Sequence, residues 1–230
     1  MKFSTTLPLV IFWIVLVADC MLMLNGLQEY RLYTKTLLVP MLMMSIFAAS
    51  KDTRHKRSKV LVMLAYFFCF AGDFLLLFDS DPSYFIWGLG AFLTAHLFFI
   101  AFFFRLKPFS DKYRLYIFTA GVIVLFYIFI LLFLVWNNVS VQSLEIPVVA
   151  YAIVLAFMLL TALHTYNNRS LRRLAKNYFI PGAVLFVFSD SALALNKFSF
   201  RFEYAGIITM VTYAAAIFML CIGISRFLSK

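Results

Sequence analysis

The stretch LYIFTAGVIVLFYIFILLFLV, residues 115–135, contains 21 residues and no charged side chain. At about 1.5 Å of rise per residue, roughly 20 apolar residues form a helix long enough to cross the hydrocarbon core of a bilayer. Seven further apolar runs of similar length flank this stretch, and polar or charged clusters separate them. The chain is therefore predicted to be an all-α integral membrane protein, a bundle of eight transmembrane helices.

The connections between these runs are short, so neighbouring spans are expected to be antiparallel. No soluble domain or low-complexity segment interrupts the series, and residues 1–230 are predicted to form a single polytopic transmembrane domain. The spans are expected at about residues 7–24, 32–49, 60–78, 84–104, 113–135, 146–164, 179–195 and 204–224.

The composition agrees with a membrane protein, since 64% of the residues are hydrophobic and 13% are charged. A soluble domain is about half apolar and roughly a quarter charged. The three cysteines lie inside apolar runs without metal-ligand spacing, and no stretch resembles a nucleic-acid-binding module. The partner predicted from composition is therefore membrane lipid, and no nucleic acid is expected.

Basic residues predict the orientation of the bundle. In an eight-span arrangement, 16 of the 20 Lys and Arg residues lie on the side that carries both termini. Cytoplasmic loops are enriched in Lys and Arg, so both termini are predicted to be cytoplasmic. The basic loops, including KDTRHKRSK at 51–59, are interpreted as topology signals in contact with anionic lipid headgroups, with partner binding left open.

Aspartates interrupt three of the apolar spans, at Asp19, Asp73 and Asp190. A charged side chain inside a membrane costs several kcal/mol when it faces lipid, so such residues normally face the bundle interior or a water-filled cavity. The helical rise places all three at a similar depth in the extracytoplasmic half. The same polar layer is predicted to include Lys35, Tyr151, Tyr213 and, nearer the middle of the membrane, His96.

The carboxyl groups of Asp73 and Asp190 suit acid–base chemistry. Burial favours the neutral form of a carboxyl group, and two nearby carboxyl groups oppose each other's ionisation. One can then donate a proton while the other stabilises a developing cation. Which aspartate has which role is left open, as is a structural alternative in which both are protonated or paired with Lys35.

Other kinds of site are weakly supported. A single histidine, His96, with scattered carboxylates is a poor metal-ligand set, so no metal or cofactor is predicted. Ser189 lacks a G-x-S-x-G elbow and a histidine at recognisable spacing, which argues against a serine-hydrolase triad. Gly72, Gly90 and Gly182 are expected to permit close approach of helices.

Five segments together form a more specific pattern: TKTLLVPMLM (34–43), AGDFLLL (71–77), GLGAFLTAHLFF (88–99), GAVLFVFSDSALALNKF (182–198) and TYAAA (212–216). In an eight-span chain they resemble the YhhN-like family of membrane proteins, whose characterised members are lysoplasmalogenases. The chain departs from the usual family pattern at Thr36, Phe99 and Ile217, where proline, tyrosine and glutamine are common.

The resemblance implies hydrolysis of the vinyl ether bond of a lysoplasmalogen, with ethanolamine or choline in the headgroup, to a fatty aldehyde and a glycerophospho-alcohol. It also implies catalytic roles for Asp73, Asp190 and His96, and a bacterial inner membrane as the location. The expected substrate-binding residues are Lys35, Tyr151, Ser189, Asn196, Tyr213 and Asp19.

Two other functions are retained. A related intramembrane hydrolase would act on a lysophospholipid ester or another ether lipid. A lipid or small-solute transporter would use the aspartate layer as a proton relay. Transport favours inverted repeats and broken helices, and the sequence has no convincing half-to-half repeat.

Overall fold

The computed structural model describes residues 3–78, 81–107, 114–142 and 144–229. Within these residues, eight helical segments are long and apolar enough to cross a membrane, which confirms the predicted all-α membrane architecture. The principal helices are α1 (Phe3–Leu24), α2 (Arg31–Ala49), α3 (Lys56–Leu75), α4 (Pro82–Leu106), α5 (Arg114–Val141), α6 (Glu145–His164), α8 (Ile180–Phe198) and α9 (Ala205–Leu228).

Short helical turns extend several of these spans. η1 (Gln28–Tyr30) leads into α2 and η2 (Leu76–Phe78) continues α3. The seventh span begins earlier than predicted, at α7 (Arg172–Leu174), and passes through a π-helical turn, η5 (Ala175–Phe179), into α8. Pro181, in the first turn of α8, has no backbone N–H to donate to the preceding turn, which favours the irregular backbone at this point.

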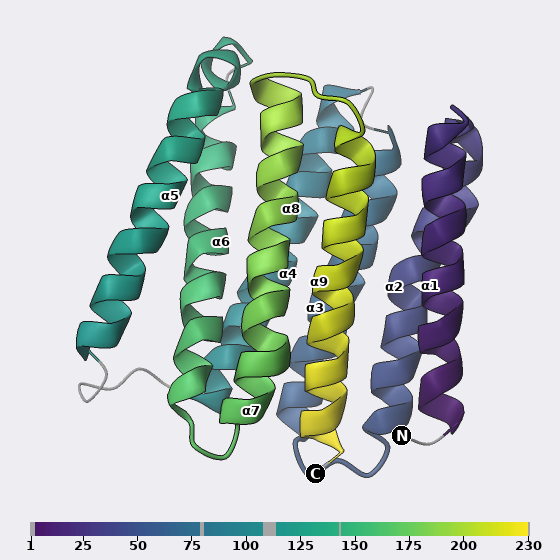
Figure 1. Cartoon of the computed structure of the whole chain (residues 1–230), viewed down its shortest axis with the longest axis vertical. Helices are drawn as coiled ribbons and strands as arrows, with labels where there is room; N and C mark the ends of the chain where they lie inside the picture. Colours follow the sequence, from purple (N-terminus) through teal and green to yellow (C-terminus); the bar gives the residue numbers. More distant parts are fainter. Residues whose placement is uncertain (1–2, 79–80, 108–113, 143, 230) are drawn as a thin grey trace.

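The helices pack mainly in the antiparallel pairs α1–α2, α3–α4 and α8–α9, with α9 in contact with α1, α2, α3 and α8. Figure 1 shows α1 and α5 at opposite edges of the bundle. Both termini lie at the same end of the bundle in this view, together with the α2–α3 and α6–α7 connections. The even number of spans and their alternating directions account for this placement.

Helix α5 exposes a largely apolar surface. Its apolar residues surround the whole helix, and Phe118, Phe126 and Phe133 are largely exposed. An apolar face that no protein residue covers is expected to face lipid in a membrane protein. The helix ends at Val141 rather than near residue 135 as predicted, and its last turns are attached by the Asn138 side chain, which donates to the Phe198 carbonyl at 2.8 Å.

Two of the three predicted close-approach glycines are confirmed. A Cβ atom at Gly72 would lie 2.6 Å from the Phe92 ring, and one at Gly182 would lie 2.8 Å from Leu220 Cγ. The prediction for Gly90 is wrong, because no heavy atom lies within 4 Å of a Cβ placed there. The absence of a side chain at Gly90 is therefore not required for the packing of the described residues.

Gly223 provides a stability test of the α9 packing. A Cβ atom at this position would lie 2.7 Å from both Tyr178 Cβ and the Phe179 ring, so the π-helical turn η5 leaves no room for it. We expect Gly223→Ala to lower the free energy of unfolding by about 1–3 kcal/mol, as overpacking does. Thermal unfolding in detergent measures this change, and Gly90→Ala is the control with unoccupied space. Equal stability of the two variants would contradict the packing described for α9.

Candidate active site

A polar cavity of about 210 Å³ lies among the helix ends that are opposite to the chain termini. It brings together six of the predicted site residues: Lys35, Asp73, Ser189, Asp190, Asn196 and Tyr213. The remaining lining residues are Met23, Arg31, Leu76, Phe92, Leu193, Gly206, Thr209 and Met210. Residues from six of the long helices thus converge on one cavity, as the similar depth of the polar residues predicted.

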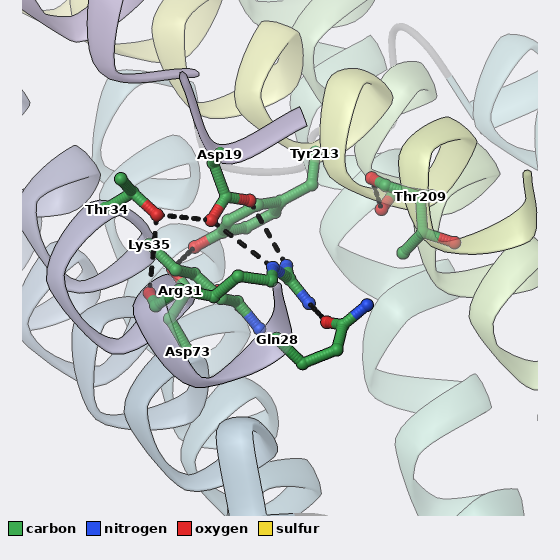
Figure 2. Close-up of polar contacts among 9 residues, drawn as sticks. Asp19, Gln28, Arg31, Thr34, Lys35, Asp73, Thr209 and Tyr213 are labelled. Atoms are coloured by element: carbon green, nitrogen blue, oxygen red, sulfur yellow. Dashed lines mark hydrogen bonds and ion pairs between the residues drawn. The ribbon is translucent and has the colours of Figure 1, made fainter. Parts of the chain in front are cut away.

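Asp73 lies near the end of α3, and both of its carboxylate oxygens have partners. The Tyr213 hydroxyl donates to Oδ2 at 2.7 Å, and Lys35 Nζ lies 3.8 Å from Oδ1. Figure 2 shows Tyr213 and Lys35 converging on this carboxylate from α9 and α2. Only 3% of the Asp73 side chain is exposed. Lys35 and Tyr213 therefore hold both oxygens of the Asp73 carboxyl group in place.

Asp190, in the middle of α8, has a different environment. The Tyr151 hydroxyl donates to Oδ2 at 2.6 Å, and His96 Nε2 lies 3.3 Å from the same oxygen. The other oxygen, Oδ1, accepts no hydrogen bond from any residue that the structure describes. The side chain is 12% exposed. Asp190 therefore presents one uncommitted oxygen, and its two partners hold the carboxyl group in place.

His96 is fully buried on α4 and is 3.0 Å from the Tyr151 hydroxyl through Nε2. Because Tyr151 has one hydroxyl proton and donates it to Asp190, Nε2 must carry a proton to interact favourably with these two oxygens. Nδ1 is buried and has no hydrogen-bond partner among the described residues. The contacts of His96 therefore suit an imidazole that donates from Nε2.

A second, apolar cavity of about 60 Å³ adjoins the polar one. Asp190, Leu76, Phe92 and Leu193 line both cavities. The other residues around the apolar cavity are Phe85, Leu89, Val148, Tyr151, Ala194 and Phe198. Among the described residues of this lining, Asp190 is the only charged one, so its side chain lies where a polar cavity adjoins an apolar one.

The remaining predicted residues lie around these carboxyl groups. Asp19 does not line the polar cavity but contacts Arg31, which does. Ser189 is buried, and its hydroxyl donates to the Thr209 backbone carbonyl at 2.9 Å, linking α8 to α9. Asn196 lines the cavity near the end of α8. In the described parts of the chain, no three His, Cys, Asp or Glu side chains gather in a way that could hold a metal ion.

Arg31 is the functional-site residue that sequence reasoning missed. It begins α2, and its side chain lines the polar cavity. Arg31 Nε and Nη2 donate to the two oxygens of Asp19 at 3.3 and 3.2 Å, and Nη1 donates to Gln28 at 3.2 Å. The signal available in the sequence is its spacing of four from Lys35, which places both cations on one helix face.

The family-pattern departure at Ile217 lies outside the polar cavity. Its side chain is buried in the core, and its carbonyl accepts a hydrogen bond from Tyr66 at 2.6 Å. Phe99 likewise packs in the core against Tyr66. Neither substitution therefore removes a group from the lining of the site.

Comparisons with known proteins find similarity to lysoplasmalogenases. The chain is 34% identical over 145 residues to the lysoplasmalogenase TMEM86B of Mus musculus, covering 63% of this chain and 56% of that protein. It is 31% identical over 160 residues to a lysoplasmalogenase of Mycobacterium bovis, covering 66% of this chain and 55% of that protein. The matched stretch thus spans little more than half of each of these relatives.

No solved structure matches the chain. The model of the YhhN family matches residues 30–224. This range includes Asp73, Asp190, His96 and all but one of the residues that line the polar cavity. The chain therefore belongs to the YhhN family.

Proposed function

We propose that the protein is a lysoplasmalogenase, an intramembrane hydrolase of the vinyl ether bond in ethanolamine or choline lysoplasmalogens. The observation that carries this proposal is the position of Asp190 at the junction of a polar and an apolar cavity. A lysoplasmalogen has its vinyl ether between a polar glycerophosphate and an apolar chain. Bound with its headgroup in the polar cavity and the first part of its chain in the apolar one, it presents that bond to Asp190.

Asp190 is proposed to be the general acid. A vinyl ether is cleaved by protonation of its β-carbon, for which the C=C π electrons form the new C–H bond and the ether oxygen stabilises the resulting oxocarbenium ion. The proton comes from the neutral carboxyl group through Oδ1, which has no other described partner.

Asp73 is proposed to stabilise the cation and to orient water. Its carboxylate, held by Lys35 and Tyr213, faces the same cavity as Asp190. Water adds to the α-carbon and gives its proton to the ionised Asp190, which restores the acid. The hemiacetal then collapses: its hydroxyl proton is lost, the C–O bond to glycerol breaks, and the glycerol oxygen is protonated. The products are a fatty aldehyde and a glycerophospho-alcohol.

His96 and Tyr151 are proposed to position Asp190, since both contact Oδ2 and leave Oδ1 directed away from them. Lys35 and Tyr213 hold Asp73 in the same way. Ser189 and Asn196 contribute polar lining, and no metal or other cofactor is assigned a step. Pairs of carboxyl groups divide acid and stabilising roles similarly in glycoside cleavage.

Ester hydrolysis of an acyl lysophospholipid is the second candidate within the same site. It would favour an activated nucleophile, yet the Ser189 hydroxyl is committed to a backbone carbonyl and contacts no described histidine. An acid that protonates carbon needs no such nucleophile. The vinyl ether is therefore the better match to the residues around the cavity, and a proton-coupled transporter is the alternative from another class.

A paired substrate assay tests the proposal. Purified protein in mixed micelles receives a lysoplasmalogen or the matched 1-acyl lysophospholipid, and fatty aldehyde and fatty acid are quantified separately. We expect aldehyde from the first substrate and no fatty acid from the second. Fatty acid release without aldehyde would replace the proposal with an ester hydrolase. Consumption of neither lipid, with protein-dependent uptake into vesicles, would favour a transporter.

We further propose that the chain forms one domain with both termini in the cytoplasm of a bacterial cell, and with the catalytic cavity in the outer half of the inner membrane. The excess of basic residues at the end that carries the termini supports this orientation. A green fluorescent protein fused to the C-terminus should fluoresce, whereas alkaline phosphatase at the same position should be inactive. The opposite pair of results would invert the orientation.

A further inference from the structure

We propose that Arg31, held by Asp19, recognises the phosphate of the substrate, and that the site therefore selects lysophospholipids over phosphate-free ether lipids. This inference rests on the proposed function and identifies the headgroup-recognition residue of the same cavity. The sequence leaves Lys35 with two alternatives, a partner for the aspartates or a substrate-binding residue. The structure assigns the phosphate to Arg31.

The hydrogen-bond donors of Arg31 support this role. A guanidinium group has five N–H donors. Three of them are used, two on the carboxylate of Asp19 and one on Gln28. The other two have no acceptor among the described residues, although the side chain is only 16% exposed and lines the polar cavity. Two N–H donors without an acceptor, on a side chain that lines a cavity, suit the recognition of phosphate by arginine.

Asp19 acts as a positioning residue for this arginine. It is fully buried, and its Oδ1 also accepts a hydrogen bond from the Thr34 hydroxyl at 2.7 Å. Figure 2 shows Arg31 between Asp19 on one side and Gln28 on the other. A guanidinium fixed by three hydrogen bonds loses little further freedom when it binds an anion, so the site is preorganised.

The charges of the cavity agree with an anionic headgroup. Its charged lining residues are Arg31, Lys35, Asp73 and Asp190. Lys35 lies 3.8 Å from the Asp73 carboxylate, and Asp190 is proposed to be neutral when substrate binds. The Arg31 charge is balanced by Asp19 behind it, which lies outside the cavity lining. The cationic donors of this lining are therefore Arg31 and Lys35, and Lys35 already has Asp73 as its partner.

The position of Arg31 also fits the length of the substrate. It begins α2 at the end of the bundle opposite the termini, whereas Asp190 lies about two turns before the end of α8 and adjoins the apolar cavity. In a lysoplasmalogen, the glycerol backbone separates the phosphate from the vinyl ether. A headgroup bound at Arg31 thus directs the vinyl ether inwards, towards the acid.

A comparison of two substrates tests this role. The protein receives 1-alkenyl-glycerophosphoethanolamine or 1-alkenyl-glycerol, which lacks the phosphate, at equal mole fraction in mixed micelles. We expect kcat/KM to be about 10- to 100-fold higher for the phosphate-bearing lipid, the range of a charge-assisted hydrogen-bond pair. Arg31→Gln should lose most of this preference through a higher KM, with little change for alkenyl-glycerol. Arg31→Lys keeps the positive charge but lacks the paired N–H donors of a guanidinium group, so it should retain only part of the preference.

Two control variants separate recognition from general effects. Arg201→Gln removes one exposed positive charge at the same end of the bundle and should keep the wild-type preference. Asp19→Asn should lower the preference partly, because Arg31 stays present but is less fixed. A wild-type protein that cleaves both lipids equally, or an Arg31→Gln variant with unchanged preference, would overturn the proposal.

A binding measurement keeps the inference testable if no cleavage occurs. The saturated 1-alkyl-glycerophosphoethanolamine and 1-alkyl-glycerol cannot undergo vinyl ether hydrolysis, so their binding is read as an increase in thermal stability. The phosphate-bearing lipid should stabilise the wild-type protein more than 1-alkyl-glycerol does, and Arg31→Gln should abolish the difference. Absence of cleavage with this difference intact would contradict the proposed function alone. Equal stabilisation by both lipids would contradict the role of Arg31.

Discussion

Replacement of Asp190 by asparagine is expected to lower kcat for aldehyde release by about 10²- to 10⁴-fold, the usual contribution of a general acid. Asparagine keeps the shape of the side chain and can still accept a hydrogen bond from Tyr151, so the fold should be retained. It has no acidic proton to give to carbon. The measurement is single-turnover aldehyde release, which reports the chemical step rather than product dissociation.

Asp52→Asn is the matched control for this substitution, because Asp52 is exposed and outside the site. It should have wild-type activity. Tyr151→Phe removes the 2.6 Å hydrogen bond to Asp190 without removing the acid, and a smaller loss of kcat is expected. Full activity of Asp190→Asn would exclude Asp190 as the proton donor and transfer that role to Asp73 or to water.

Variants of the ion pair between Lys35 and Asp73 should separate its contribution to stability from its contribution to catalysis. Both side chains are nearly buried, with 11% and 3% exposed, and removal of one partner from a buried pair costs about 3–5 kcal/mol. We expect Lys35→Met to lower the free energy of unfolding by an amount of this order. The double variant Lys35→Met/Asp73→Asn should recover much of the loss, because no unpaired charge remains.

The same double variant is expected to be inactive, because the carboxylate that stabilises the oxocarbenium ion is gone. Thermal unfolding in detergent and aldehyde release are measured on the same preparations. Asp73→Asn alone should also be inactive, although it leaves Lys35 without its carboxylate partner. Activity in the stable double variant would show that Asp73 only supports the fold and would remove it from the mechanism.

The depth of the site residues was predictable from the sequence, because the rise of a helix converts residue number into distance along its axis. This is why Asp73, Asp190 and Tyr213 were placed in one layer. The eight spans were predictable for the same reason, since each apolar run has the length of a membrane. The end of α5 was misplaced because Asn138, a polar residue, finds a partner on α8 and extends the helix.

Rotation about the helix axis was not predictable, because transmembrane helices are apolar on several faces and the sequence carries a weak signal of direction. The contact of His96 with Asp190 rather than Asp73 depends on such rotations. So does the side chain of Arg31, which points into the cavity although the residue follows a loop. The packing of Phe92 against Gly72 likewise required the relative placement of α3 and α4.

Hydrolysis in D₂O tests the central claim most directly, namely that cleavage begins with proton transfer to carbon at Asp190. Lysoplasmalogen is incubated with the purified protein in D₂O, and the aldehyde is reduced at once to the alcohol for mass spectrometry. We expect one deuterium at carbon 2 of the product, formed at a rate that Asp190→Asn lowers. Aldehyde that forms enzymatically without deuterium at carbon 2 would contradict protonation of the vinyl ether as the route of cleavage.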